Sequence, residues 1–158
     1  MKKITIISGE KHSGKTTKLL EIISDFKLRN ISYAGILAIG TFKHNQRHSF
    51  DIVDVSTQEK MEFMSVEPSI GSDKIGRFYI NKNALEFGNR VLEKAIISNA
   101  KYIIIDEIGP LELDKKGWAR ILNKSIEANK NIIISVRKEL LNNILKKFKI
   151  SEFELIKI

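Results

Sequence analysis

Cysteine is absent from the sequence, histidine occurs three times and proline twice. Without cysteine the chain can form no disulfide, no thiolate nucleophile and no thiolate zinc site. Only His44 and His48 have the spacing of two zinc-binding histidines on a helix, which is a poor match to a metalloprotease. No apolar run approaches the ~20 residues that span a bilayer, and the N-terminal run is shorter than the ~7–15 residues of a signal peptide. We therefore expect a soluble cytoplasmic protein without membrane contact.

The length and the charge of the chain narrow its class further. Its 158 residues, without repeats or low-complexity segments, predict a single domain over residues 1–158. We expect a monomer or a weak oligomer. Lysine and arginine total 27 against 19 aspartates and glutamates, and a net charge of +8 attracts polyanions such as nucleotides and nucleic acid. The lysines are scattered, however, and such a composition also results from genome bias or adaptation to heat, so nucleic acid is the weaker alternative partner.

Short apolar runs alternate with helical patterns along most of the chain. The β-branched runs predict buried strands, and apolar residues three and four positions apart predict helices. This alternation predicts an α/β sandwich of three layers with a mostly parallel sheet. An alternating stretch predicts an antiparallel hairpin insertion at about 40–66, with strands at 48–55 and 60–64. The other predicted strands are 4–7, 32–39, 77–80, 102–105, 132–134 and 153–158, and the predicted helices are 15–28, 85–100, 116–128 and 138–148.

One motif between the first predicted strand and the first predicted helix carries most of the functional information. It matches G-x-x-x-x-G-K-S/T in full, in the context of a phosphate-binding loop. Gly9 and Gly14 would let the backbone take positive φ around an anion, which the amides at the helix N-terminus would face. Lys15 would contact the β- and γ-phosphates, and Thr16 would offer its hydroxyl to Mg²⁺. We predict nucleotide contacts from the whole segment: Gly9, Glu10, Lys11, His12, Ser13, Gly14, Lys15, Thr16 and Thr17.

Two carboxylates, Asp106 and Glu107, directly follow the apolar run 102–105. In a parallel sheet the carboxyl end of such a strand lies at the same edge as the phosphate loop. There Asp106 would hold Mg²⁺ through its water shell, and Glu107 would accept a proton from an attacking water. We therefore predict Lys15 and Glu107 as catalytic residues, and Thr16 with Asp106 as the metal-binding pair.

Two further residues lie at the end of the next predicted strand. Ser135 would either sense the γ-phosphate and orient the water or cap the end of its strand. Arg137 would either stabilise transition-state charge as an arginine finger in cis or belong to the surface or a helix terminus. We expect the three histidines, His12, His44 and His48, to face solvent and to have no catalytic role. We expect Trp118 to lie in the core.

With these residues in view, the chain resembles the small P-loop nucleoside-triphosphatases first known from thermophiles, called cancer-related NTPases in animals. The resemblance extends over nearly the whole chain and depends on three strings: 8–17, 49–55 and 105–113. The last string, IDEIGPLEL, is the most specific, since D-E-I-G-x-M/L-E-L is close to a signature of that family. Members often have a histidine before a basic residue after the strand at 132–134, where this chain has Ser135-Val136-Arg137.

The resemblance implies a RecA-like sheet and Mg²⁺-dependent hydrolysis of ATP, GTP and other nucleoside triphosphates to diphosphate and phosphate. Lys15 and Thr16 carry over as phosphate and metal residues, and Asp106 and Glu107 carry over as metal-side carboxylate and base. Glu112 matches a family carboxylate to which the sequence itself assigns no role, and it is the next candidate for the base.

Two other functions remain open at this point. A small nucleotide or metabolite kinase has the same phosphate loop and size, but such kinases usually need an arginine-rich lid, and the loop at 68–76 contains no arginine. A nucleotide-switched module that binds nucleic acid agrees with the basic charge, but the chain lacks a cluster of aromatic and basic residues.

Overall fold

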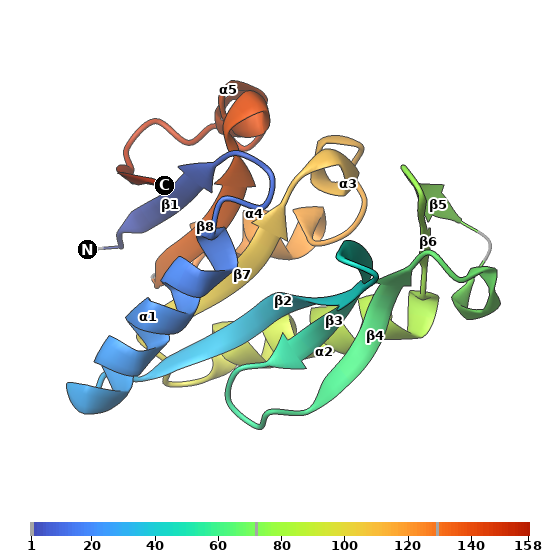
Figure 1. Ribbon diagram of the computed structural model, residues 1–158. Coiled ribbons are helices and arrows are strands. Elements are labelled where there is room, and N and C mark those ends of the chain that lie inside the picture. The colour runs from blue at the N-terminus through green and yellow to red at the C-terminus, as the bar shows by residue number, and fades with distance from the viewer. Residues whose placement is uncertain (1, 72, 129) are drawn as a thin grey trace.

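The computed structural model describes residues 2–71, 73–128 and 130–158, and its centre is one mixed sheet (Figure 1). The order of the strands in this sheet is β5-β6-β4-β3-β2-β7-β8-β1-β9. Their bounds are Ile4–Gly9 for β1, Tyr33–Lys43 for β2, Gln46–Asp54 for β3, Lys60–Ser65 for β4, Lys74–Ile75 for β5, Phe78–Ile80 for β6, Tyr102–Ile108 for β7, Asn131–Arg137 for β8 and Glu154–Lys157 for β9.

The parallel half of the sheet runs from β2 through β7, β8 and β1 to β9. Isoleucine dominates its central strands, and residues such as Ile6, Ile104 and Ile134 are fully buried. Such continuous apolar runs are expected where helices cover both faces of a parallel sheet. Because these strands are parallel, β1, β7 and β8 all end at the same edge, where the functional residues lie.

Helices cover the two faces of the sheet unequally. The helix α1 (Lys15–Leu28) packs through Leu19, Ile23 and Phe26 on one face. The opposite face is covered by α2 (Lys82–Ile97) and α4 (Ala119–Glu127), with α5 (Leu141–Lys147) beside them (Figure 1). The expected α/β sandwich of three layers is therefore present.

The antiparallel half of the sheet is larger than the predicted hairpin. The strands expected at 48–55 and 60–64 exist as β3 and β4, but β2 also continues to Lys43 and pairs with β3. The turn between them is formed by His44 and Asn45, both with positive φ, as a two-residue hairpin loop requires. Beyond β4, the short strands β6 and β5 extend the sheet by further antiparallel pairing.

Helix boundaries differ from the predictions for local reasons. α2 begins three residues early because Asn81 caps it, accepting a hydrogen bond from the amide of Asn83 at 3.0 Å. α4 begins only at Ala119, and a separate short helix, α3 (Pro110–Leu113), precedes it. The helix expected at 138–148 begins with a 3-10 turn, Lys138–Leu140, and a second 3-10 turn, Pro68–Ile70, lies in a segment expected to be a loop. Among the helices described, none has the length and apolarity needed to cross a membrane.

Candidate functional site

The loop between β1 and α1 forms an open cradle for an anion. Gly14 takes the left-handed conformation, with φ 102°, directly before the first turn of α1. No side chain caps this helix, so its first amides have no intrahelical acceptor and face the cavity above them. Gly9, for which we also expected positive φ, is not left-handed; instead, a Cβ there would lie 2.4 Å from Ser13 Oγ. The lack of a side chain at Gly9 gives space for the tight turn.

Lys15 is buried at the base of this loop. Its Nζ donates to the carbonyl of Glu10 at 2.8 Å and to that of Gly9 at 3.4 Å. These are the roles the structure gives to Gly9 and Glu10, since neither lines the phosphate cavity. An ammonium has three donors, so a third remains for a phosphate oxygen. Burial lowers the pKa of Lys15, while the nearby Glu107 carboxylate opposes this shift.

Asp106 is the buried centre of a hydrogen-bond network. Its Oδ2 accepts from Thr16 Oγ1 at 2.8 Å and from the amide of Ala38 at 3.1 Å, and its Oδ1 accepts from Ser135 Oγ at 2.5 Å. Burial raises the pKa of Asp106, and these three hydrogen bonds oppose the rise. The network ties α1, β2 and β8 to β7. Ser135 does not cap the end of its strand, because β8 continues to Arg137, and its hydroxyl donates to Asp106.

Glu107 points into the cavity beside Asp106 and forms an ion pair with Arg137, whose Nη2 lies 3.4 Å from Glu107 Oε1. Both side chains keep more than a quarter of their surface exposed. Burial raises the pKa of Glu107, with a further rise from Asp106, whereas Arg137 and Lys15 lower it. The structure thus brings Arg137 into the site and places it next to the carboxylate, and Arg137 also directly precedes the 3-10 turn Lys138–Leu140.

Arg47 is a site residue that the sequence pattern did not predict, because the first strand of the hairpin was expected to begin only at residue 48. A register shift in the β2–β3 pairing leaves His48 without a partner, so Arg47 and Phe50 lie on one face of β3. The Arg47 guanidinium stacks on Phe42 and Phe50, each at 4.8 Å, and lines the phosphate cavity. Gly40 makes room for it, since a Cβ there would lie 2.9 Å from Arg47 Cζ.

Glu112 has a structural position. Its two carboxylate oxygens accept from the amides of Gly109 at 2.7 Å and Trp118 at 2.9 Å, and the side chain is buried. It therefore holds the segment between β7 and α4, which explains why α4 starts late. Burial raises its pKa to about 7 despite these hydrogen bonds. With both oxygens occupied, Glu112 is not placed as an alternative to Glu107.

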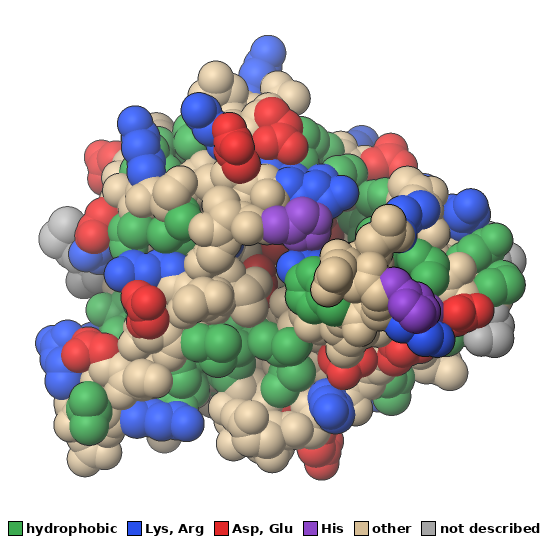
Figure 2. Space-filling view, in the orientation of Figure 1, with side chains coloured by type: hydrophobic (Ala, Val, Ile, Leu, Met, Phe, Trp, Pro, Cys, Tyr) green, Lys and Arg blue, Asp and Glu red, His purple; other side chains and the backbone are tan. Residues whose placement is uncertain are grey.

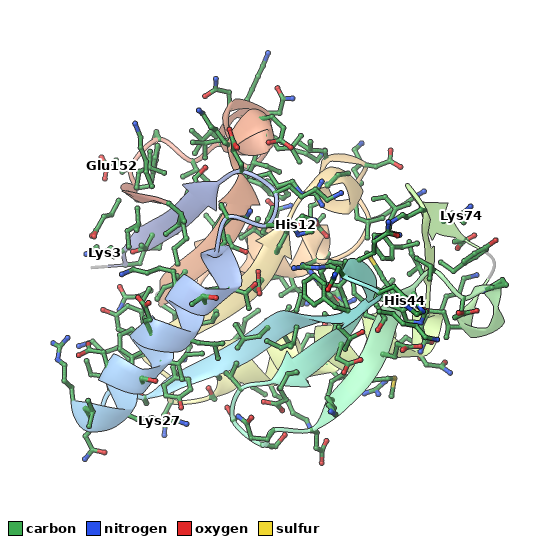
Figure 3. All side chains as sticks on the ribbon, in the orientation of Figure 1. Lys3, His12, Lys27, His44, Lys74 and Glu152 are labelled. Atoms are coloured by element: carbon green, nitrogen blue, oxygen red, sulfur yellow. The ribbon has the colours of Figure 1, made fainter. Side chains whose placement is uncertain are left out.

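Two of the three histidines, His12 and His44, face solvent as expected, whereas His48 is partly buried within β3. His12 is exposed on the phosphate loop and His44 lies at the β2–β3 turn (Figure 3). His48 lies 3.8 Å from Glu67 and lines neither cavity. Burial and the nearby Arg47 lower the pKa of His12. Trp118 is 2% exposed and belongs to the core, but one side of it also lines a cavity.

Two adjoining cavities open at this edge of the sheet, and the space-filling view shows the hollow between basic and acidic side chains (Figure 2). The phosphate cavity has a volume of about 220 Å³, and its wall includes all the loop residues from Lys11 to Thr17. The second cavity, about 450 Å³, has mainly apolar walls. Asp106, Glu107, Arg47 and Arg137 line both of them.

The donor set fits a magnesium ion held partly by water. Thr16 Oγ1 and Asp106 Oδ2, two hard oxygen donors, lie within 2.8 Å of each other at the floor of the phosphate cavity. Mg²⁺ is usually bound through one or two such oxygens together with phosphate and water oxygens. Among the described residues, no group of three or more histidine, aspartate or glutamate side chains could bind a metal ion.

Sequence comparisons connect these features to known proteins. A family model described as NTPase matches residues 4–158. The nucleoside-triphosphatase THEP1 of Sulfurisphaera tokodaii is 32% identical over 130 residues, which are 82% of this chain and 74% of that protein. The protein of the same name from Methanothermobacter thermautotrophicus is 27% identical over 149 residues, 94% of this chain and 84% of that protein.

Structural comparisons give the same picture for the fold. The crystal structure of THEP1 from the hyperthermophile Aquifex aeolicus superimposes with a TM-score of 0.75 at 24% identity, covering 98% of this chain and 88% of that one. The solution structure of a human cancer-related nucleoside triphosphatase gives 0.74 at 19% identity, covering 99% and 88%. At these identities the two structures establish a shared architecture.

Proposed function

The chain belongs to the NTPase family whose model it matches over residues 4–158, and from this premise we propose that it is a Mg²⁺-dependent nucleoside triphosphatase. It hydrolyses ATP, GTP and other nucleoside triphosphates to the diphosphate and phosphate. The observation that carries the proposal is the convergence of Lys15, Thr16, Asp106 and Glu107 on one cavity of about 220 Å³. A phosphate-binding cation, two metal-binding oxygens and a second carboxylate that can accept a proton are together what hydrolysis of a phosphoanhydride requires.

Binding of the triphosphate rests on the loop from Gly9 to Thr17. The amides at the start of α1 and the positive end of its dipole attract the phosphates. Lys15 adds a charge beside the β- and γ-phosphates from a position that its hydrogen bonds to the loop hold in place. Thr16 and Asp106 would hold Mg²⁺, which when bound neutralises charge on the β- and γ-phosphate oxygens.

Glu107 is the base for the attacking water. Its carboxylate is raised in pKa by burial, which makes it a stronger proton acceptor than an exposed glutamate. The water donates its proton to Glu107 as its oxygen bonds to the γ-phosphorus, and the bond to the bridging oxygen breaks. Arg137, 3.4 Å from Glu107, and Arg47, at the wall of the same cavity, supply positive charge near the γ-phosphate.

The proposed site recognises phosphate rather than the base. No N-K-x-D string of the guanine-reading kind occurs in the chain, and every group assigned above faces phosphate or metal. We therefore expect ATP, GTP, CTP and UTP to be hydrolysed within about tenfold of one another, which corresponds to ~1.4 kcal/mol.

The test is phosphate release from each of the four triphosphates by the purified chain, with and without Mg²⁺. Lys15→Ala serves as the matched inactive variant, and it should lose affinity and rate together because Lys15 acts in both ground and transition states. A Lys15→Ala protein with the wild-type affinity and rate would refute the phosphate-loop assignment, and a hundredfold preference for one base would refute the broad specificity.

A further inference from the structure

The apolar cavity of about 450 Å³ is far larger than hydrolysis requires. One water occupies ~30 Å³ in the liquid, whereas pockets for small organic ligands measure ~300–1,000 Å³ and combine apolar walls with a few polar groups. This cavity has that character. Its walls come from the antiparallel extension and from the segment after β7, and they include Ile52, Phe63, Met64, Ile75, Phe78, Leu111 and Trp118.

Aromatic side chains shape the cavity. The Phe63 and Trp118 rings contact each other with centroids 5.4 Å apart, and Phe50 meets Phe78 edge-on at 5.5 Å. These pairs fix the walls and present flat faces and edges to the interior, which suit a planar ring. Because Glu112 also holds the backbone at Trp118, this wall is anchored from both sides.

Two basic residues in the cavity wall, Arg47 and Arg77, lack an ion-pair partner among the described residues, although Asp106, Glu107 and Glu112 line the same cavity. Within the described ranges, neither Arg47 nor Arg77 forms an ion pair with a carboxylate, and Arg47 Nε is buried without a hydrogen-bond partner. Arg77 instead donates to the carbonyl of Arg47. Two such arginines attract a ligand that carries an anionic group in addition to its apolar body.

The proposed role of Glu107 relates the two cavities to the reaction. In phosphoryl transfer the attacking oxygen approaches in line, opposite the leaving diphosphate and its nucleoside. If Glu107 activates the attacking group, its place in the walls of both cavities puts the apolar cavity on the attacking side of the γ-phosphate.

We propose that the apolar cavity is an acceptor subsite for a small aromatic alcohol, preferably one that carries a carboxylate or similar anion. This inference rests on the proposed function of the phosphate site. The acceptor hydroxyl oxygen bonds to the γ-phosphorus, the bond from that phosphorus to the bridging oxygen breaks, and the hydroxyl proton passes to Glu107. The products are a nucleoside diphosphate and a phosphate monoester, and water is the acceptor when the cavity is empty.

Trp118 provides a direct test of occupancy, because it is the single tryptophan of the chain and lies in the cavity wall. The probes are benzyl alcohol, 4-hydroxybenzoate and 4-(hydroxymethyl)benzoate. We expect a saturable change in tryptophan fluorescence with at least one of them, and tighter binding of 4-(hydroxymethyl)benzoate than of benzyl alcohol. Ile75→Phe, which fills part of the cavity, should weaken binding at least ~tenfold. Ile97→Phe makes the same change at an exposed position of α2 and should behave as the wild type.

Transfer is measured separately, by ³¹P NMR of mixtures of protein, Mg-ATP and probe. The expected result is a phosphate monoester signal that is present with Ile97→Phe and reduced with Ile75→Phe. Absence of saturable binding for all three probes overturns the subsite, and so does an equal loss of ADP affinity in Ile75→Phe, which would place the nucleoside in this cavity. Binding with phosphate as the sole product overturns the acceptor role. Failure of the proposed function gives a different result: no phosphate would be released from Mg-ATP in the assay that contains no probe.

Discussion

The edge formed by β1, β7 and β8 and the extension formed by β3, β4, β5 and β6 meet at Glu107, and each stabilises its own cavity differently. At the edge, Asp106 accepts three hydrogen bonds from three separate segments, so its carboxylate is held in one position. In the extension, apolar packing shapes the wall, and most of its surface is complementary to rings rather than to charges. Held polar groups suit chemistry that is the same for every substrate, whereas an apolar wall suits selection of one molecule.

Glu107, which lines both cavities, gives the strongest test of this comparison. Glu107→Gln keeps the size of the side chain but removes its basicity, so we expect the hydrolysis rate to fall ~10²–10⁴-fold with nucleotide affinity unchanged. Rate and affinity are measured by phosphate release and by titration with ADP. Asp106→Asn is the matched variant and should instead raise the Mg²⁺ concentration needed for activity. Normal hydrolysis by Glu107→Gln would show that the base is another residue.

Arg47 tests whether the extension contributes to chemistry as well as to the apolar wall. The guanidinium lines the phosphate cavity while it belongs to β3. Arg47→Ala should lower the maximal rate about 10²-fold, as the loss of one group that faces developing charge does. Arg120→Ala is the control, because Arg120 forms an exposed ion pair with Glu93 on the helical face. Equal rates for both variants would confine catalysis to the β1, β7 and β8 edge.

Sequence patterns predicted the edge far better than the extension, for a physical reason. The phosphate loop is contiguous, and a buried apolar run that ends in Asp106 and Glu107 implies its place in a parallel sheet. The five strands of the parallel half, β1, β2, β7, β8 and β9, therefore followed from periodicity, as did the position of α1. In contrast, the role of Ser135 depends on its burial against a strand that lies distant in sequence, and a pattern contains no such contact.

Arg47 shows what strand alternation cannot predict. Strict alternation places residues 47 and 50 on opposite faces of a strand. The register shift at His48 places them on the same face, and the missing side chain of Gly40 gives the guanidinium its space. The effects of Gly40 and of the register shift on the position of Arg47 can be seen only when the pairing of β2 with β3 is known.

Glu112 holds the segment between the two regions through hydrogen bonds from the amides of Gly109 and Trp118, and its contribution can be measured as free energy of unfolding. Glu112→Gln replaces one accepting oxygen by an amide that cannot accept, so we expect unfolding free energy to fall by about 1–3 kcal/mol near pH 5. The wild-type carboxyl has a folded pKa of about 7 and an ordinary value of 4.5. Between these values the folded state binds a proton that the unfolded state has lost. The stability from Glu112 is therefore full below pH 4.5 and declines as pH rises to 7.

The decline is on the order of 3 kcal/mol for such a shift, and Glu112→Gln lacks it. This decline is as large as the gap of about 1–3 kcal/mol expected near pH 5. Chemical denaturation of both proteins at pH 5, 6 and 8 should therefore show the gap closing as pH rises, with Glu112→Gln at least as stable as the wild type at pH 8. A gap that stays constant would mean that Glu112 is ionised throughout this range in the folded protein. Other buried carboxyls are shared by the two proteins and cancel in the difference.

The smallest effect is expected from nucleic acid, which would have to use a surface outside both cavities. Lys3, Lys27 and Lys74 lie on different sides of the molecule (Figure 3), and basic side chains alternate with acidic ones on the visible face (Figure 2). Without a continuous basic track, binding should be no tighter than ~10⁻⁴–10⁻⁶ M at physiological salt and should weaken steeply as salt rises. Phosphate release is measured with single- and double-stranded DNA and RNA at two salt concentrations, and we expect it to stay within about twofold of the basal rate. A stimulation of tenfold or more near physiological salt would instead identify a nucleic-acid-dependent enzyme, in which a third region controls the two cavities.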